Sequence, residues 1–460
     1  MTPRRTFKEP KMDLSFSKQF AVDLAREAVV RGATAAEVML RHRVEFSVSV
    51  RLGEVETLKE SMDRGFGLRV LLDGKQASVS GSDFSKDSVS SLIQEAIEMA
   101  RVTSPDDSAG LPEPAEMAAS LADLDLYDPD ISDLATEEKI NLALRAEMAA
   151  REASPKIVNF DGGGFDSRAG AMVLANSQGF VAEYSGTSCS ISTVPVALDN
   201  ERMQRDYWYD CRRKLRDMDS PESIGAEAAR RTLRKLGART VKNQSVPVVF
   251  EPNVAKELLG DIFHAVSGES IFRKASFLVG QRGEQVASPR LTVIDDGTLP
   301  TLLGSRPFDA EGLPTRRTVV IEDGVLANYL LNTYTAKKLG LRSTGNASRG
   351  LVGAPGVGVG NLFIQPGPDS PEQIIASVRN GLYVTELIGF GVNVVNGDYS
   401  RSASGMWIQN GELAFPVQGV TVAGNLKEML NSIEMVGDDL DFRGSIVSPT
   451  LMIGRMTISA

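Results

Sequence analysis

The spacing of apolar residues changes along the first fifty residues, and this change constrains the fold more than any other feature of the sequence. In residues 17–32, apolar side chains such as Ala21, Leu24 and Ala28 recur at helical spacing, and a glycine ends the run where a C-terminal cap would stand. In residues 44–50 every second residue is apolar, which is typical of a strand with one buried face. The sequence therefore predicts a fold that mixes helices with strands.

A hairpin and a second helix complete a first unit. Two apolar runs flank Asp73-Gly74, and an Asp-Gly pair between such runs is a strong hairpin signal. Helical spacing then returns over residues 85–101. We assign residues 15–110 to an N-terminal α+β unit.

The next stretch is rich in Pro, Asp, Ser and Ala and lacks periodicity, so residues 111–135 are interpreted as a linker. Residues 136–240 form a second α+β unit that repeats the plan. Its helix, strands and closing helix are expected at 136–153, 156–160, 170–176, 179–196 and 220–237. Because helix, meander and helix occur twice, a duplication of one unit is the favoured interpretation.

From about residue 246 the sequence consists of short apolar runs separated by Gly and Asp. Asp323-Gly324 and Asn410-Gly411 predict hairpin turns. Helices are fewer, and are expected at 252–266, 334–340, 370–381 and 426–436. We expect residues 241–460 to form a C-terminal β-rich, mixed-sheet domain, and the whole chain to be an α+β protein.

Charge and cysteine content exclude several classes of protein. The net charge is -10, and aspartates flank the one basic run, residues 212–216, so direct binding of nucleic acid is not expected. No stretch approaches the roughly 18 consecutive apolar residues of a membrane span, and the first residues lack the apolar core of a signal peptide. The only cysteines, Cys189 and Cys211, are too few for a disulfide scaffold, so we expect a cytoplasmic protein.

The chain contains only two histidines, His42 and His264. A zinc-protease helix needs two imidazoles and a glutamate, and a Ser-His-Asp triad needs a histidine beside an activated serine. Neither site can be built from these parts, and from the residues alone His264 is interpreted as a packed or hydrogen-bonded side chain.

Two other patterns favour structural roles. The glycine-rich run 353–360 has G-x-G-x-G spacing and leads into a strand, so it is interpreted as a structural loop and not as a phosphate cradle. Paired carboxylates such as Asp295 and Asp296 fall at strand ends, where Asp commonly shapes turns. A magnesium or calcium site held by carboxylates alone stays open as an alternative.

Long motifs give the chain a close resemblance to the TldD/TldE (PmbA) family, also known as peptidase U62 and as modulators of DNA gyrase. The most specific is the run GFGVNVVNGDYSRSASGMWIQNGELAFPVQGVTVAGNL, residues 389–426. Further similar stretches are residues 64–70, 174–180, 270–278, 307–312, 334–346 and 435–440. The resemblance covers nearly the whole chain.

The resemblance implies a specific division of labour. TldD-type chains look like the catalytic ones, with zinc held by a His-Glu-x-x-x-His helix and a C-terminal cysteine. In this chain Leu259 falls at the first histidine, Gly260 at the glutamate and His264 at the second histidine, and residues 441–449 contain no cysteine. The resemblance therefore implies a PmbA/TldE-like subunit with no catalytic residue, metal or cofactor of its own.

On this reading the chain is inactive alone and forms a heterodimer with a TldD-type subunit, which brings the zinc. The pair would degrade or mature unfolded peptides, and the chain would form a homodimer when its partner is absent. Two other functions stay open: a stand-alone hydrolase with an oxygen-ligand metal site, and a non-enzymatic regulator of the DNA gyrase modulator type.

By analogy with the family, five residues are candidates for peptide binding: Arg273, Asp309, Glu311, Asn346 and Asp398. The alternative for all five is a role in turns and in the scaffold of the core.

Overall fold

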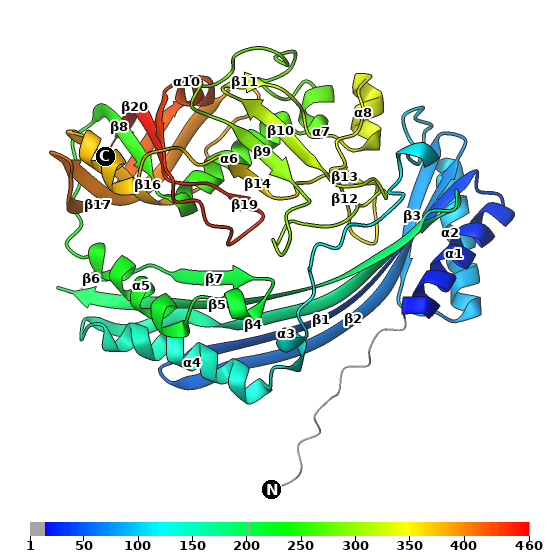
Figure 1. Cartoon of the computed structure of the whole chain (residues 1–460), viewed down its shortest axis with the longest axis horizontal. Helices are drawn as coiled ribbons and strands as arrows, with labels where there is room; N and C mark the ends of the chain where they lie inside the picture. The colour runs from blue at the N-terminus through cyan, green and yellow to red at the C-terminus, as the bar shows by residue number, and fades with distance from the viewer. Residues whose placement is uncertain (1–13, 201, 460) are drawn as a thin grey trace, which may run out of the picture.

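The computed structural model describes residues 14–200 and 202–459. Its N-terminal half is built on one long, curved antiparallel sheet (Figure 1). The sheet has the order β3-β2-β1-β4-β5-β6, and β7 also pairs with β5. Its strands are β1 (Ala35–Arg51), β2 (Glu54–Leu72), β3 (Lys75–Gly81), β4 (Ile157–Asn176), β5 (Val181–Asp199), β6 (Arg202–Arg205) and β7 (Trp208–Arg212).

The two predicted meanders are joined edge to edge. β1 pairs with β4 without a break from Glu37–Asn176 to Ser49–Gly164. The prediction of an α+β fold is confirmed, and the strands of the two predicted units pair into one shared sheet. A sequence pattern describes each strand singly and carries no information about which meander edge finds a partner.

Strand β4 also differs from its prediction, which placed separate strands at 156–160 and 170–176. The intervening glycines form a bulge within one continuous strand, where Gly162 and Gly163 have φ of 101° and 132°. Next to them, a Cβ on Gly164 would lie 1.9 Å from the carbonyl oxygen of Val48. Glycine here allows a bulge and a close strand approach, and does not mark a loop.

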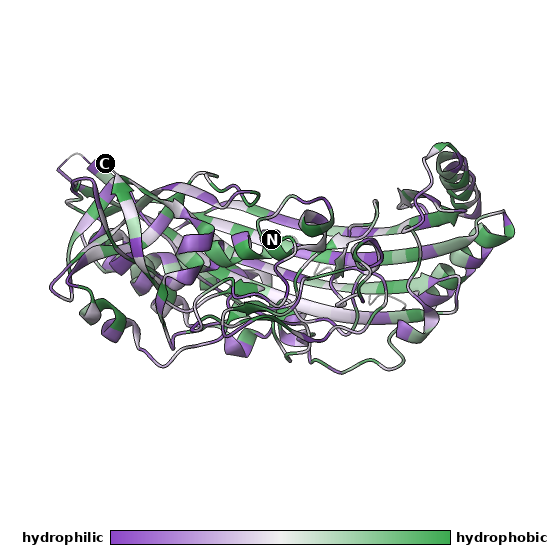
Figure 2. Ribbon diagram, turned by 90° about the horizontal axis from the view of Figure 1, so that it is seen from above, coloured by the Kyte–Doolittle hydropathy of each residue, from purple (hydrophilic) through white to green (hydrophobic). Residues whose placement is uncertain are grey.

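Both faces of the sheet are covered in part, by different partners. Val38 and Leu40 pack under helices α1 and α2 at one end, and Phe46 and Val48 pack under α4 and α5 at the other. Met39, one residue out of phase, points to the opposite face and contacts the C-terminal domain. Figure 2 shows the alternating hydrophobic and hydrophilic bands along the long strands. The helices are α1 (Leu14–Val30), α2 (Lys86–Val102), α4 (Thr136–Glu152) and α5 (Pro221–Arg234).

The predicted linker is a packed strap that runs between the sheet and the C-terminal domain. It contains a short 3-10 turn (η1, Pro114–Glu116) and a short helix (α3, Pro129–Asp133). The amide of Ala118 donates to Gly312 O at 3.0 Å, and Leu124 O accepts from Thr301 N at 2.9 Å. These bonds satisfy the backbone of a segment that has no regular partner.

The C-terminal domain places a central helix, α6 (Pro252–Val266), between two sheets (Figure 1). One sheet has the order β17-β16-β15-β8-β20-β18 and is closed into a barrel by a further β17–β20 pairing; the other has the order β11-β10-β9-β14-β19. Both contain a parallel pair, so the predicted mixed-sheet character is confirmed. The elements are β8 (Gln244–Phe250), α7 (Gly268–Phe272), β9 (Val293–Asp296), β10 (Arg317–Glu322), β11 (Val325–Leu326), α8 (Thr333–Leu339), β12 (Ala347–Ser348), β13 (Gly356–Val357), β14 (Leu362–Ile364), α9 (Pro371–Ser377), β15 (Asn380–Ile388), β16 (Asp398–Gln409), β17 (Glu412–Asn425), α10 (Leu426–Asn431), β18 (Ile433–Val436), β19 (Ile446–Val447) and β20 (Leu451–Ser459).

Turn predictions in this domain are confirmed and two helix ends are corrected. Asp323-Gly324 and Asn410-Gly411 both adopt positive φ at each residue, as a type I′ hairpin requires. The predicted helix 370–381 ends at Ser377, and the predicted helix 426–436 ends at Asn431. In both cases the apolar residues that follow the helix belong to a strand of the barrel sheet. Pairing with neighbouring strands outweighs the helical preference that the local spacing indicates.

Among the residues that the structure describes, no helix is long and apolar enough to cross a membrane. Cys189 and Cys211 are both free thiols on the neighbouring strands β5 and β7.

Candidate functional site

Helix α6 carries the positions that the resemblance singled out. A proline occupies its first turn, where a missing N–H costs nothing. One face of the helix is buried in the core, with Leu258 and Ile262 each no more than 2% exposed. The opposite face carries Glu257 and His264. The helix therefore has one stripe for packing and one that turns away from the core.

The three positions that the resemblance aligns with a zinc motif do not converge. Leu259 is 0% exposed and belongs to the core, whereas His264 is exposed, with its ring centroid 5.4 Å from that of Phe263. Positions five apart in a helix lie about 140° apart around its axis, because each residue turns by about 100°. Gly260 borders open space, since a Cβ there would meet nothing within 4 Å. The residues present do not fit a zinc ion, because they offer one imidazole and no base.

An arginine neutralises the polar stripe of α6. The Nη1 atom of Arg401, on β16, lies 2.6 Å from Glu257 Oε2. Burial raises the pKa of Asp261 to about 6, and the charge of Arg401 opposes that rise. In residues 14–200 and 202–459, no three His, Cys, Asp or Glu side chains group in a way that would hold a metal ion. The geometry thus puts a guanidinium beside these carboxylates.

Three of the five predicted peptide-binding residues meet in one buried network, and Asp309 is its centre. Its Oδ1 accepts the backbone N–H groups of Glu311 at 2.9 Å and Leu313 at 3.0 Å, and its Oδ2 accepts that of Ala347 at 2.9 Å. Asp309 is fully buried. It therefore ties the turn after Phe308 to strand β12.

Glu311 and Asn346 extend this network. Glu311 Oε2 accepts the backbone N–H of Thr333 at 2.8 Å, at the start of α8. Asn346 Nδ2 donates to Asp295 Oδ2 at 2.7 Å and to Gly358 O at 3.0 Å. Both side chains are at most 2% exposed, so in this structure they hold loops together and do not face solvent.

The carboxylates of the network hold protons more tightly than usual. Burial raises the pKa of Asp309, and burial together with the nearby charge of Asp309 raises the pKa of Glu311 to about 7. Burial raises the pKa of Asp295 to about 6 against the hydrogen bonds from Asn346 and Gly360. Two neighbouring carboxyl groups in a network buried from water are not both fully ionised near neutral pH.

The other two candidates lie apart from this network. Arg273 is exposed at the end of α7, with its guanidinium 5.5 Å from the ring centroid of Phe272. Asp398 is exposed at the start of β16 and accepts from Asn396 Nδ2 at 2.6 Å. The structure therefore brings together three of the five predicted residues.

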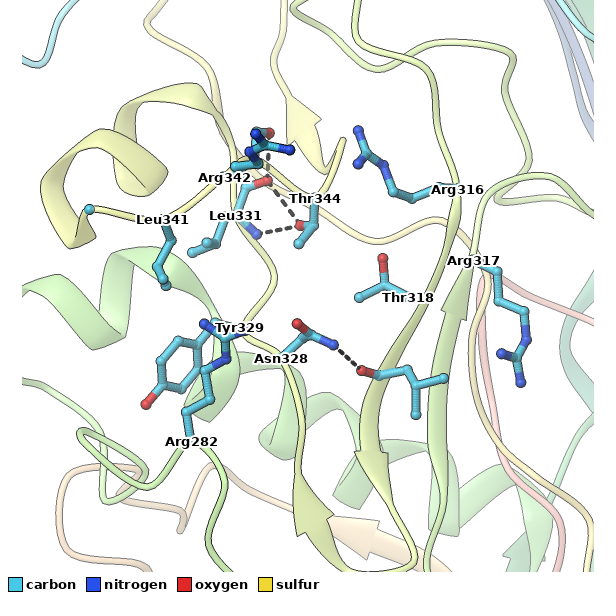
Figure 3. Close-up of a pocket in the computed structure, with 13 residues that line it drawn as sticks. Arg282, Arg316, Arg317, Thr318, Asn328, Tyr329, Leu331, Leu341, Arg342 and Thr344 are labelled. Carbon is cyan, nitrogen blue, oxygen red and sulfur yellow. Dashed lines mark hydrogen bonds between the residues drawn. The ribbon is translucent and has the colours of Figure 1, made fainter. Parts of the chain in front are cut away.

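A cavity of about 670 Å³ forms a groove beside the segment 328–331 (Figure 3). That segment lies beside the C-terminal end of α6, since Leu330 N donates to Val266 O at 3.2 Å. Tyr329 and Leu341 form an apolar wall, and an adjoining cavity of about 500 Å³ shares both residues. The groove carries four arginines and, among the described residues, no carboxylate lines it; the arginines are Arg282, Arg316, Arg317 and Arg342.

One wall of the groove is an open strand edge. β11 pairs only with Ile321 and Glu322 of β10, so residues 317–319 have no neighbouring strand on the side away from β9, as far as the described chain shows. Asn328 Nδ2 donates to Val319 O at 2.9 Å within the groove (Figure 3). Sequence reasoning missed the four arginines, because they come from three separate segments and form no run.

Comparisons with known proteins agree along the whole chain. Models of the PmbA/TldA metallopeptidase domain 1, central domain and C-terminal domain match residues 36–100, 129–236 and 243–460. The metalloprotease PmbA of Escherichia coli O157:H7 is 39% identical over 95% of both chains. A metalloprotease PmbA homolog of Haemophilus influenzae is 34% identical over 98% of this chain and 97% of its own.

Solved structures share the fold. A protein of Bacteroides thetaiotaomicron, provisionally described as a modulator of DNA gyrase, superposes with a TM-score of 0.90 at 28% identity and covers 98% of this chain and 99% of its own. TldE of Thermococcus kodakarensis superposes with a TM-score of 0.87 at 24% identity, over 95% of this chain and 99% of its own, which shows a common fold.

Proposed function

This chain belongs to the PmbA/TldD metallopeptidase family, and from that premise we propose that it is the non-catalytic, PmbA/TldE-type subunit of a zinc metallopeptidase acting on unfolded peptides. One observation carries the proposal: on α6, Leu259 belongs to the core, Gly260 has no side chain, and His264 stands alone at the surface. The zinc and its base then come from a homologous TldD-type subunit in a heterodimer.

The groove beside residues 328–331 suits the peptide-binding part of this role. An open strand edge receives an extended peptide by main-chain hydrogen bonds, which gives affinity with little sequence specificity. Four arginines without a lining carboxylate favour peptides with acidic residues. The buried network of Asp309, Glu311 and Asn346 then supports the groove from behind, because Asn346 Oδ1 accepts a hydrogen bond from the hydroxyl of Thr344, which lines the groove.

An uncovered edge of the N-terminal sheet supports association with a second chain. Among the described residues, β3 pairs only with residues 66–72 of β2, and residues 54–64 are all exposed. Val55, Leu58 and Met62 are between 44% and 53% exposed along this edge. A long free edge with apolar side chains is a ready template for strand pairing, so we place the subunit contact here. The two free thiols suit a reducing compartment such as the cytoplasm.

The test compares the purified chain, a purified TldD-type homologue and their mixture. We expect less than stoichiometric zinc in this chain, and cleavage of an unfolded peptide only in the mixture. His264→Ala in this chain should leave the activity of the mixture unchanged. Cleavage by this chain alone, abolished by a chelator and by His264→Ala, would mean a stand-alone hydrolase. Failure to bind the homologue in size-exclusion chromatography would favour a regulator.

A second experiment tests the groove. Arg342→Glu should weaken the binding of an acidic, unfolded peptide to the mixture, because it places a carboxylate in a groove that has none. Arg379→Glu, at an exposed position outside the groove, is the matched control. Equal loss in both variants would show that only the overall charge matters.

A further inference from the structure

A second basic cavity lies where the curved sheet meets the C-terminal domain. Its volume is about 310 Å³, within the range of small-ligand sites. The wall on the sheet side includes Arg41 of β1 and Tyr184 of β5, and the opposite wall includes Arg306 and Arg349. The elements that meet here are far apart in the sequence, so no local pattern could have indicated the cavity.

The lining is strongly and unusually positive for a chain with a net charge of -10. Six arginines face this cavity, and no Asp or Glu is among the described residues that line it. Three of the six share two nearby carboxylates: Glu45 lies 2.7 Å from Arg168 and 3.1 Å from Arg43, and Glu37 lies 3.0 Å from Arg349.

The other three arginines have no carboxylate within ion-pair distance in the described chain. Arg213 is held by carbonyl oxygens alone, with Nη2 donating to Leu303 O at 2.8 Å and Nε to Leu302 O at 3.0 Å. Arg306 buries Nε and Nη2 without a hydrogen-bond partner. Arg41 is half-buried, and burial together with Arg43 lowers its pKa.

The guanidinium group of Arg349, which is almost fully buried, also has an unused donor at this site. The Arg349 side chain is 1% exposed, and its Nε has no hydrogen-bond partner in residues 14–200 and 202–459, although its Nη2 faces Glu37. Buried guanidinium nitrogens normally find acceptors, because leaving them unmet costs the full desolvation of a charged donor. Several such donors around one cavity indicate a missing acceptor.

We propose that this interdomain cavity is an oxyanion-binding site that takes a carboxylate or phosphate group between Arg41, Arg306 and Arg349. A guanidinium fork matches two oxygens of such a group, and charge-assisted bonds of this kind are about twice as strong as neutral ones. Tyr184, whose ring packs edge-on against Phe308 at 5.3 Å, closes one side of the cavity. Because both domains supply donors, the bound anion also links them.

The experiment titrates the full-length chain by calorimetry at constant ionic strength, with chloride as the reference anion. The probes are inorganic phosphate, triglycine, and triglycinamide, which lacks the terminal carboxylate. We expect saturable binding of phosphate or of triglycine. A preference for triglycine over its amide identifies a peptide carboxylate as the ligand, and binding of phosphate alone identifies a phosphate group.

Two site variants and a control decide whether the cavity is responsible. Arg306→Met and Arg41→Met should each weaken binding at least about tenfold, since each removes one charge-assisted contact. Arg379→Met, at an exposed position that lines neither cavity, should leave it unchanged. If Arg306→Met fails to fold, Arg41→Met on the half-buried strand position still gives the answer. No saturable binding of any probe, or equal affinity in Arg41→Met, would overturn the proposal.

Discussion

At the scale of single residues, Glu311 shows how the buried network depends on pH. Its folded pKa of about 7 lies above the ordinary 4.5, so the protonated form favours the fold. This stability is fully present below about pH 4.5 and is lost as the pH rises through 7. The difference between the folded and the ordinary pKa corresponds to about 3 kcal/mol in the free energy of unfolding.

Glu311→Gln should remove this dependence. The amide oxygen can still accept the N–H of Thr333, and no charge forms beside Asp309. We expect the free energy of unfolding of the variant to exceed that of the parent at pH 8 and to be nearly equal to it at pH 5. Urea denaturation at both pH values measures the difference. Glu322→Gln, at an exposed position of β10, should change neither value, and a Glu311→Gln variant that is less stable at pH 8 would contradict the assignment.

Single substitutions at Leu259 and Gly260 test whether α6 could hold the zinc motif that the resemblance aligns with these positions. Leu259→His would put an imidazole into the core of the C-terminal domain, and we expect a loss of about 3 kcal/mol from the lost packing and the buried polar group. Gly260→Glu should be tolerated, because open space surrounds that position and glycine is a poor helix residue. The double variant should still bind less than one zinc per chain. One equivalent by atomic absorption would contradict the geometry of α6.

At the scale of elements, β2 approaches the C-terminal domain closely enough to require glycine. A Cβ on Gly67 would lie 1.8 Å from the carbonyl oxygen of Leu351, which cannot yield without a backbone shift. A Cβ on Gly65 would lie 3.1 Å from Leu351 Cδ1, the end of a flexible side chain. Gly67→Ala should therefore lower the melting temperature by several degrees, and Gly65→Ala by little. Equal melting temperatures of the two variants would show that the loop carrying Leu351 can shift away from β2 at little cost.

The elements also show where sequence reasoning works. The hairpin turns at Asp73, Asp323 and Asn410 were predictable, because two consecutive residues with positive φ favour Asp or Asn followed by Gly. Helix α6 was predicted with both ends correct, since its apolar stripe and terminal residues agree. The three positions that the resemblance aligned with a zinc motif all lie on this helix.

Long-range pairing is what the sequence did not reveal. The junction of β1 with β4, the continuity of β4 through its glycines, and the strand after α9 all depend on partners far along the chain. The arginines of the two cavities come from separate segments for the same reason. Local spacing describes one element at a time, and these features exist only between elements.

At the scale of the whole molecule, buried ion pairs join the curved sheet to the C-terminal domain. Glu37 of β1 lies between Arg349, at 3.0 Å, and Arg69, at 3.4 Å, and all three side chains are at most 3% exposed. At the far end of the interface, Arg234 of α5 lies 3.0 Å from Glu251, just before α6. The two domains therefore share charges that neither can solvate while they stay together.

Removing Glu37 should uncouple the domains. Glu37→Ala leaves two guanidinium groups buried without their carboxylate, and such a loss costs about 3–5 kcal/mol. The two guanidinium groups come from the two sides of the interface, Arg69 from the sheet and Arg349 from the C-terminal domain, so the cost falls mainly on the interface and not on either core. We expect the variant to unfold in two steps where the parent unfolds in one. Asp199→Ala, which breaks an exposed pair with Lys156, should cost about 1 kcal/mol or less and keep one step.

The two tryptophans can separate these steps, because they sit in different parts of the molecule. Trp208 lies on β7 at the domain interface, with the guanidinium groups of Arg231 and Arg443 at 4.9 Å and 4.6 Å from its ring, whereas Trp407 is buried in the barrel. In the Glu37→Ala background, Trp407→Phe leaves a probe of the interface and Trp208→Phe leaves a probe of the barrel. The interface probe should change at a lower urea concentration than the barrel probe. Coincident transitions would mean that the barrel and the sheet unfold as one unit even without this ion pair, and that apolar contacts such as Met39 with Phe308 suffice to couple them.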